Sequence, residues 1–127
     1  MTILGIDTST SICKIWLNDS YYQEELNRLM AKNILAFIDK ILKNEKVELE
    51  ELGGICVVAG PGSFTGLRIG STVANTIADA LSIPIISVSG DSGEWYNKAK
   101  AKLLEGENQN MITPVYDKQA NITMPRK

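Results

Sequence analysis

The chain has 127 residues, 44% of them hydrophobic, and its formal net charge at pH 7 is -2. This composition fits one compact domain with a core, and it gives no basic surplus for a large nucleic-acid footprint. The sequence contains 0 histidines. That excludes histidine acid–base catalysis, serine–histidine and cysteine–histidine nucleophiles, and zinc sites that need imidazole.

The cysteines and lysines carry weak functional signals. Cys13 and Cys56 stand far apart in apolar runs and form no CxxC pair, so we expect buried thiols and no metal or redox site. Lys98, Lys100 and Lys102 indicate either a solvated helix face or a local basic patch. No apolar run is long enough to cross a bilayer, and a charge interrupts the first one. We therefore expect a cytoplasmic chain with no signal peptide and no membrane partner.

The N-terminal third predicts an antiparallel meander. An apolar run, Ile3–Ile6, is followed by the polar turn Asp7–Ser11 and by a second β-prone run, Ile12–Leu17. After a second turn, Tyr21–Glu25 provides a third candidate strand.

Residues 27–44 show helical spacing with two apolar stripes. The first stripe contains Leu26, Met30, Ile34, Phe37 and Ile41; the second contains Ala31, Leu35, Ile38 and Leu42. A helix on a single sheet needs only one such stripe. The second stripe therefore indicates either another helix of the same chain or a protein partner. We expect two of its members, Leu35 and Ile38, to face solvent in the monomer.

The remaining chain alternates strands and helices. Residues 45–52 form an acidic connector with one possible helical turn, and Ile55–Ala59 reads as a buried strand. A helix is predicted from Gly66 to Leu81 with Thr65 as its N-cap. Small residues at every fourth position, Gly66, Gly70, Ala74 and Ala78, would let its backbone lie close to a sheet or to another helix.

A further strand, Ile85–Val88, precedes a third helix. Asp91 and Glu94 have the spacing of a capping box for this helix, and Gly106 can end it. The tail 111–124 is strand-like. The order of elements predicts an α/β fold with a mixed sheet, antiparallel opening strands and packed helices.

The glycine-rich loop Gly60–Gly66 raises the question of whether the chain binds a phosphate. It fits neither a P-loop, because Leu67 stands where lysine is needed, nor the dinucleotide fingerprint, because Thr65 replaces the third glycine. Free amides at the helix start, with Ser63 and Thr65, leave a generic anion site as one interpretation. A strand-to-helix turn that needs glycine is the other. We expect Phe64 to be a core residue under the loop.

The opening turn offers a second anion candidate. Asp7 ends the first strand before a hydroxyl-rich turn, an arrangement that resembles the first phosphate hairpin of the actin-like ATPases. Ser9 stands where that hairpin usually has glycine, and its bulk argues against close phosphate approach. The candidate, vestigial anion or nucleotide site comprises Asp7, Thr8, Ser9, Gly62, Ser63 and Thr65.

Four segments, "ILGIDTST", "FIDKIL", "GGICVVAGPGSFTGLRIG" and "IPIISVS", resemble the TsaB (YeaZ) family in order and spacing, over about Met1–Ser89. The resemblance implies an actin-like (ribonuclease H-like) lobe. It also implies a non-catalytic subunit that pairs with the enzyme TsaD, together with the ATPase TsaE, to install threonylcarbamoyl on the tRNA adenosine beside the anticodon. Pairing in the family uses the first two long helices. The implied interface comprises Ala31, Leu35, Ile38, Leu42, Arg68, Thr72, Asn75 and Asp79.

Residues 1–90 are expected to form this lobe, and 91–127 a helix and short strand that are the remnant of a second lobe. "MITPVYDKQANIT" resembles the segment that opens that lobe, which is otherwise largely missing. We expect no catalytic residue, no metal and no Mg-ATP binding by the chain alone. We also expect homodimers in isolation, and only indirect tRNA contact.

Two questions stay open from the sequence. The alternative function is an actin-like ATPase or phosphotransferase that uses Asp7, Mg²⁺ and the Gly60–Gly66 loop, with Asp117 as second carboxylate. Arg68 is predicted either to contact the partner or an anion, or to cap carbonyls or pair with Asp79 in its own helix.

Overall fold

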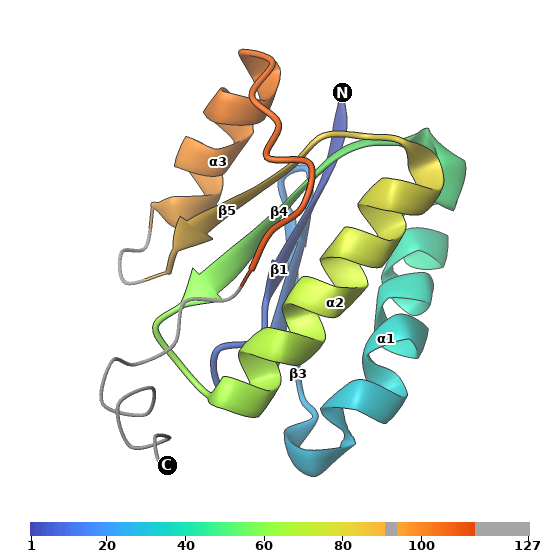
Figure 1. Ribbon diagram of the computed structural model, residues 1–127. Helices are drawn as coiled ribbons and strands as arrows, with labels where there is room; N and C mark the ends of the chain where they lie inside the picture. The colour runs from blue at the N-terminus through green and yellow to red at the C-terminus, as the bar shows by residue number, and fades with distance from the viewer. Residues whose placement is uncertain (91–93, 114–127) are drawn as a thin grey trace, which may run out of the picture.

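The computed structural model describes residues 1–90 and 94–113, and these build a five-stranded mixed sheet (Figure 1). The strand order is β3-β2-β1-β4-β5. Three strands form the antiparallel meander predicted from the sequence: β1 (Thr2–Asp7), β2 (Ile12–Leu17) and β3 (Ser20–Glu25). Two more continue the sheet in parallel beyond β1: β4 (Leu52–Gly60) and β5 (Ile85–Ser89). The mixed sheet with an antiparallel opening is confirmed.

Helices cover both faces of the sheet (Figure 1). α1 (Met30–Asn44), preceded by a 3₁₀ turn η1 (Asn27–Leu29), lies with α2 (Phe64–Leu81) on one face. α3 (Trp95–Leu104) lies on the other, and a short 3₁₀ turn, η2 (Leu49–Glu51), precedes β4. None of the helices in the described part of the chain is long and apolar enough to cross a membrane.

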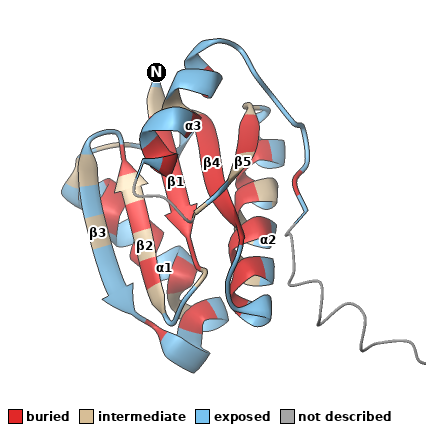
Figure 2. Ribbon diagram, turned by 90° about the vertical axis from the view of Figure 1, so that its left-hand side faces the viewer, coloured by how far each residue is buried: buried red, intermediate tan, exposed pale blue. Residues whose placement is uncertain are grey.

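The alternation of β1 side chains divides the core into two layers. Leu4 and Ile6 pack under α1 and α2, whereas Ile3 packs under α3. Gly5 also faces α3, where a Cβ would come within 2.6 Å of the Tyr96 ring. The absence of a side chain at this position therefore admits the aromatic residues that anchor α3. Figure 2 shows the contrast between the buried central strands and the exposed edge strand β3.

The two cysteines confirm the expectation of buried thiols. Cys13 lies in the core layer under α1 and α2, and Cys56 lies in the layer under α3. Burial raises the pKa of each thiol to about 12. Separate and desolvated, the two thiols form no disulfide.

All three helix starts differ from the prediction: α1 begins at Met30 after the 3₁₀ turn, and α3 begins at Trp95 with Glu94 as its N-cap and not as its third residue. Ser63, not Thr65, caps α2, because the helix begins at Phe64, two residues earlier than predicted, and the Ser63 hydroxyl accepts from the Gly66 amide at 3.2 Å. Gly106, at φ +92°, follows the end of α3 as predicted, and its amide donates to the Leu103 carbonyl. The predicted cap Asp91 and the tail from residue 114, including Asp117, lie outside the described residues.

Candidate functional site

The second apolar stripe of α1 is covered in one half and open in the other. Leu35 is 59% exposed and Ala31 is exposed as well, whereas Ile38 is 3% and Leu42 4% exposed. The prediction that Ile38 faces solvent is therefore wrong, and Leu42 is not available to a partner either. Both belong to the core layer that also contains residues of the C-terminal half of α2, so the chain's own second helix covers this part of the stripe.

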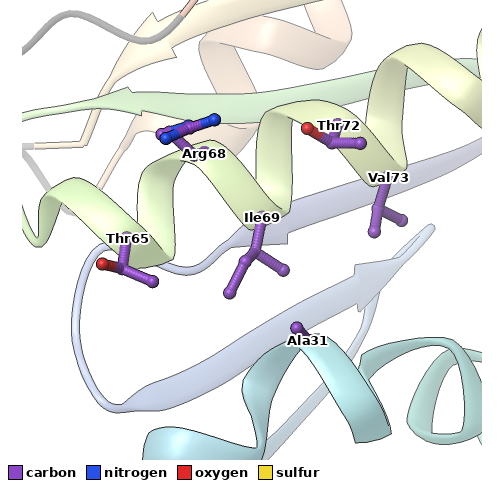
Figure 3. Close-up of a pocket in the computed structure, with 6 residues that line it drawn as sticks. All are labelled: Ala31, Thr65, Arg68, Ile69, Thr72 and Val73. Atoms are coloured by element: carbon purple, nitrogen blue, oxygen red, sulfur yellow. The ribbon is translucent and has the colours of Figure 1, made fainter.

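Between the N-terminal halves of α1 and α2 the helices leave a hollow of about 330 Å³ (Figure 3). Thr65, Ile69 and Val73 project from α2 toward α1, where Ala31 lies (Figure 3). A second hollow of about 380 Å³ shares Thr65 and Ile69 and extends the first to the start of α1 and the hairpin turn after β1. We call the two together the α1–α2 groove, lined by Thr10, Ser11, Asn27, Arg28, Met30, Ala31, Ser63, Thr65, Gly66, Arg68, Ile69, Thr72 and Val73.

Large apolar side chains remain in solvent beside this groove. Leu29 is 53% and Phe64 51% exposed, in addition to Leu35. The prediction that Phe64 is a core residue is wrong. Since α2 already begins at Phe64, the residue falls on the solvent side of the first turn, one helical turn before Arg68.

Arg68 stacks on that ring. Its guanidinium carbon lies 5.6 Å from the centroid of Phe64. The alternative pairing with Asp79 is not formed, because the ion pairs among the described residues are Lys43–Asp39 and Lys100–Asp19. Arg68, Thr72 and Asp79 are exposed, which leaves their predicted interface role open.

Asn75 departs from the prediction. Its amide nitrogen donates to the Ile112 carbonyl and its amide oxygen accepts from the Ile112 amide, both at 2.9 Å. The segment after α3 runs back along β5 to reach this point (Figure 1): the Gln109 amide donates to the Ile85 carbonyl at 2.8 Å. Asn75 therefore holds the protein's own backbone with both ends of its side-chain amide. The polar pattern of α2 could not reveal this, because the contact spans 37 residues of sequence.

The turn after β1 is occupied by its own hydrogen bonds. Both the amide and the hydroxyl of Ser9 donate to one oxygen of Asp7, at 2.9 and 2.6 Å. Asp7 is buried, and Thr8 beside it is fully buried, donating its hydroxyl to the Gly66 carbonyl at 2.6 Å. The structure thus brings Asp7, Thr8 and Ser9 together with the start of α2, as the candidate anion site requires.

The glycine loop packs directly on that turn. The Ser63 amide donates to the Ser9 carbonyl at 2.8 Å, and a Cβ on Gly62, at φ +155°, would lie 2.5 Å from the Ser9 Cβ. Cβ atoms on Gly66 and Gly70 would overlap the Thr8 carbonyl and hydroxyl oxygens. Gly66 and Gly70 therefore serve a close approach of the α2 backbone, as their spacing predicts, but the segment they approach is the turn after β1 and not a strand or another helix. Thr8 is the partner that sequence reasoning missed.

Two weaker candidates carry no site. In the lysine cluster, the Lys100 Nζ forms an ion pair with Asp19 at 3.0 Å and lies 5.1 Å from the centroid of the Tyr96 ring. This lysine therefore belongs to the packing of α3. Among residues 1–90 and 94–113, no group of three or more histidine, cysteine, aspartate or glutamate side chains could hold a metal ion.

Residues 23–119 match the sequence model of the family described as TsaD, tRNA N6-adenosine threonylcarbamoyltransferase. The chain belongs to this family. It is 36% identical over 93 residues to the "tRNA threonylcarbamoyladenosine biosynthesis protein TsaB" of Haemophilus influenzae, covering 70% of this chain and 39% of that protein. To the Escherichia coli protein of the same name it is 32% identical over 119 residues, covering 87% and 52%.

Among solved structures, YeaZ from Pseudomonas aeruginosa matches with a TM-score of 0.66 and 35% identity, over 69% of this chain and 43% of that one. The fold is therefore the actin-like lobe that the sequence resemblance implies. The chain spans about two fifths to one half of the length of these relatives.

Proposed function

We propose that the chain is a non-catalytic subunit that pairs with a TsaD-like enzyme in the threonylcarbamoylation of the tRNA adenosine next to the anticodon. The support from the comparisons is that its relatives are named for threonylcarbamoyladenosine biosynthesis. In this proposal the enzyme supplies the chemistry and contacts the tRNA, and the chain stabilises the enzyme.

The observation that carries the proposal is the α1–α2 groove with its exposed apolar border. Leu29, Leu35 and Phe64 are each more than half exposed, and each lies within one helical turn in sequence of residues that line the groove. Apolar side chains that gather beside a concave surface are typical of a protein-binding site. The groove is built from the two helices that pair in the family according to the sequence resemblance.

The turn after β1 supports the non-catalytic part of the proposal. One Asp7 oxygen already accepts two hydrogen bonds from Ser9, and the loop amide of Ser63 is bound to the Ser9 carbonyl. A phosphate would have to displace these contacts. None of the comparisons favours the ATPase alternative, and we propose that the chain alone binds no Mg-ATP. A calorimetric titration with Mg-ATP would test this, and saturable heat that is lost in Asp7→Ala would contradict it.

We further propose that two copies pair through the same surface when the enzyme is absent, and that a TsaE-like ATPase joins only the complex with the enzyme. The compartment in this proposal is the cytoplasm, where tRNA is modified.

Co-expression with the TsaD-like protein of the same organism, followed by size-exclusion chromatography with light scattering, tests the pairing. The proposal expects a stable complex and expects none when Leu35 is replaced by Asp. Leu104→Asp is the matched control, because Leu104 is 66% exposed on α3, across the sheet from the groove. A chain that elutes alone at micromolar concentrations beside a folded enzyme would overturn the proposal.

A further inference from the structure

The α1–α2 groove has a local charge opposite to that of the chain. The whole chain carries 15 acidic and 13 basic residues, yet the groove lining contains two arginines, Arg28 and Arg68, and no aspartate or glutamate. Lys32 adds a further cation in the first turn of α1, where it is exposed. The positive charge of the groove lining therefore does not follow from the overall composition, which is slightly acidic.

Both helices also begin without acidic residues. Neither α1 nor α2 has aspartate or glutamate in its first turn, and the first acidic residues along them are Asp39 and Asp79, in their second halves. Acidic residues are favoured at helix N-termini because they offset the partial positive charge of the free amides. Asp7, in the turn that packs on the start of α2, is buried and bound to Ser9, so Arg28 and Arg68 are the charged side chains that the groove lining presents to a binding partner.

The floor of the groove is apolar. Ile69 and Val73 project from α2 toward Ala31 of α1, and Thr65, Arg68 and Thr72 lie along α2 beside them (Figure 3). An apolar floor between polar, cationic sides fits the apolar ridge of an amphipathic helix whose flanks carry carboxylates. It fits RNA poorly, since a phosphate backbone would leave Ile69 and Val73 unpaired with any apolar group.

Arg68 is held ready for a carboxylate. Its guanidinium carbon lies over the Phe64 ring, 5.6 Å from the ring centroid, and this contact restricts the side chain while its N–H groups can still donate hydrogen bonds. A carboxylate accepts two parallel hydrogen bonds from that edge. Arginine beside an aromatic side chain is also the composition typical of the residues that dominate binding energy at interfaces.

We propose that the α1–α2 groove is a cationic docking site for an acidic amphipathic helix, and that Arg28 and Arg68 pair with carboxylates on the two flanks of that helix. This inference rests on the proposed function and specifies the partner: the TsaD-like enzyme presents an apolar helix ridge bordered by aspartate or glutamate. Charge complementarity then sets the rate and the register of docking, and the exposed leucines add apolar contact.

The test uses the chain and immobilised TsaD-like protein in biolayer interferometry at about 50 and about 500 mM NaCl, since salt screens exposed charges over this range. We compare the wild type with the double variant Arg28→Glu/Arg68→Glu. Lys98→Glu/Lys102→Glu is the matched control, because it changes the net charge equally at exposed residues of α3. The milder pair Arg28→Gln/Arg68→Gln repeats the test without added acid, and circular dichroism checks each fold.

We expect the wild-type association rate to fall roughly tenfold or more between the two salt concentrations, and the groove reversal to weaken binding by at least about tenfold at low salt. The control should stay within about twofold. Binding that is insensitive to salt and to the groove reversal would overturn this inference and leave the proposed function standing. The same variants are also measured against immobilised tRNA. If the groove reversal abolished binding to tRNA but left binding to the enzyme unchanged, the groove would be assigned to nucleic acid and this inference would be overturned. A wild type that does not bind at either salt concentration would overturn both.

Discussion

The two halves of one helical stripe have different fates in this protein. Ala31 and Leu35 in the first half of α1 remain in solvent beside the groove, whereas Ile38 and Leu42 in the second half are buried against the chain's own core. All four residues have the same apolar character and the same spacing. The difference shows that the extent of a docking surface is set by where the neighbouring helix leaves room, not by the stripe itself.

The largest expected loss of stability tests directly whether the second half of the α1 stripe is buried. Ile38→Asp would place a carboxylate in the core layer without a cation to pair with it, and we expect it to lower the free energy of unfolding by about 3–5 kcal/mol. Urea denaturation followed by circular dichroism measures this. A loss below about 1 kcal/mol would mean that the second half of the stripe is open after all.

A second prediction concerns the end of α2 that borders the groove. Gly66→Ala would drive a methyl group into the Thr8 carbonyl oxygen, and we expect a loss of about 2–3 kcal/mol, because neither backbone segment can move easily. Ala80→Gly, at an exposed position near the other end of α2, should cost only about 1 kcal/mol through helix propensity. Equal losses in the two variants would show that the open half of the helix pair is not anchored to the hairpin turn.

Asn75 tests whether the predicted interface on α2 is already in use. Asn75→Ala removes the two hydrogen bonds to Ile112, and we expect a loss of about 1–2 kcal/mol. The Ile112 amide should also exchange its hydrogen faster in the variant, which nuclear magnetic resonance can follow. Unchanged exchange would show that the segment after α3 is held by other contacts and that Asn75 remains available to a partner.

Substitutions at the N-cap of α2 are expected to cause the smallest loss of stability. Ser63→Ala should lower stability by about 1 kcal/mol because it removes the acceptor of the Gly66 amide, whereas Thr65→Ala should stay within about 0.5 kcal/mol. Thermal unfolding of the two variants checks the order. The reverse order would restore the cap predicted from the sequence.

These comparisons also show what could be predicted from the sequence. The strands, the helices and their order followed from apolar periodicity and from the glycines that interrupt it. The four-residue separation of Gly66 and Gly70 predicted the close approach of α2. Periodicity alone, however, describes one helix at a time. It could not show that the second half of the α1 stripe packs within its own chain, or that Asn75 binds a segment 37 residues away.

The errors at the glycine loop have a local cause. Because α2 starts two residues earlier than predicted, its cap is Ser63 and not Thr65, and the Phe64 side chain points into solvent. Boundaries of this kind depend on a single hydroxyl finding a single amide, so a sequence pattern places them only approximately. The exposed Phe64 and the Arg68 stacked on it were consequently missed as a pair, although both lie in the most specific motif of the chain.

The central claim is that the open half of the α1 stripe is a surface for a protein partner. The most direct test is the dissociation constant of the TsaD-like protein for Leu35→Asp, with Leu104→Asp as control, measured by calorimetry on chains shown to be folded. We expect both variants to lose less than about 1 kcal/mol of stability, since both residues are exposed. Binding should be abolished in Leu35→Asp alone, and equal wild-type affinity in both variants would contradict the account.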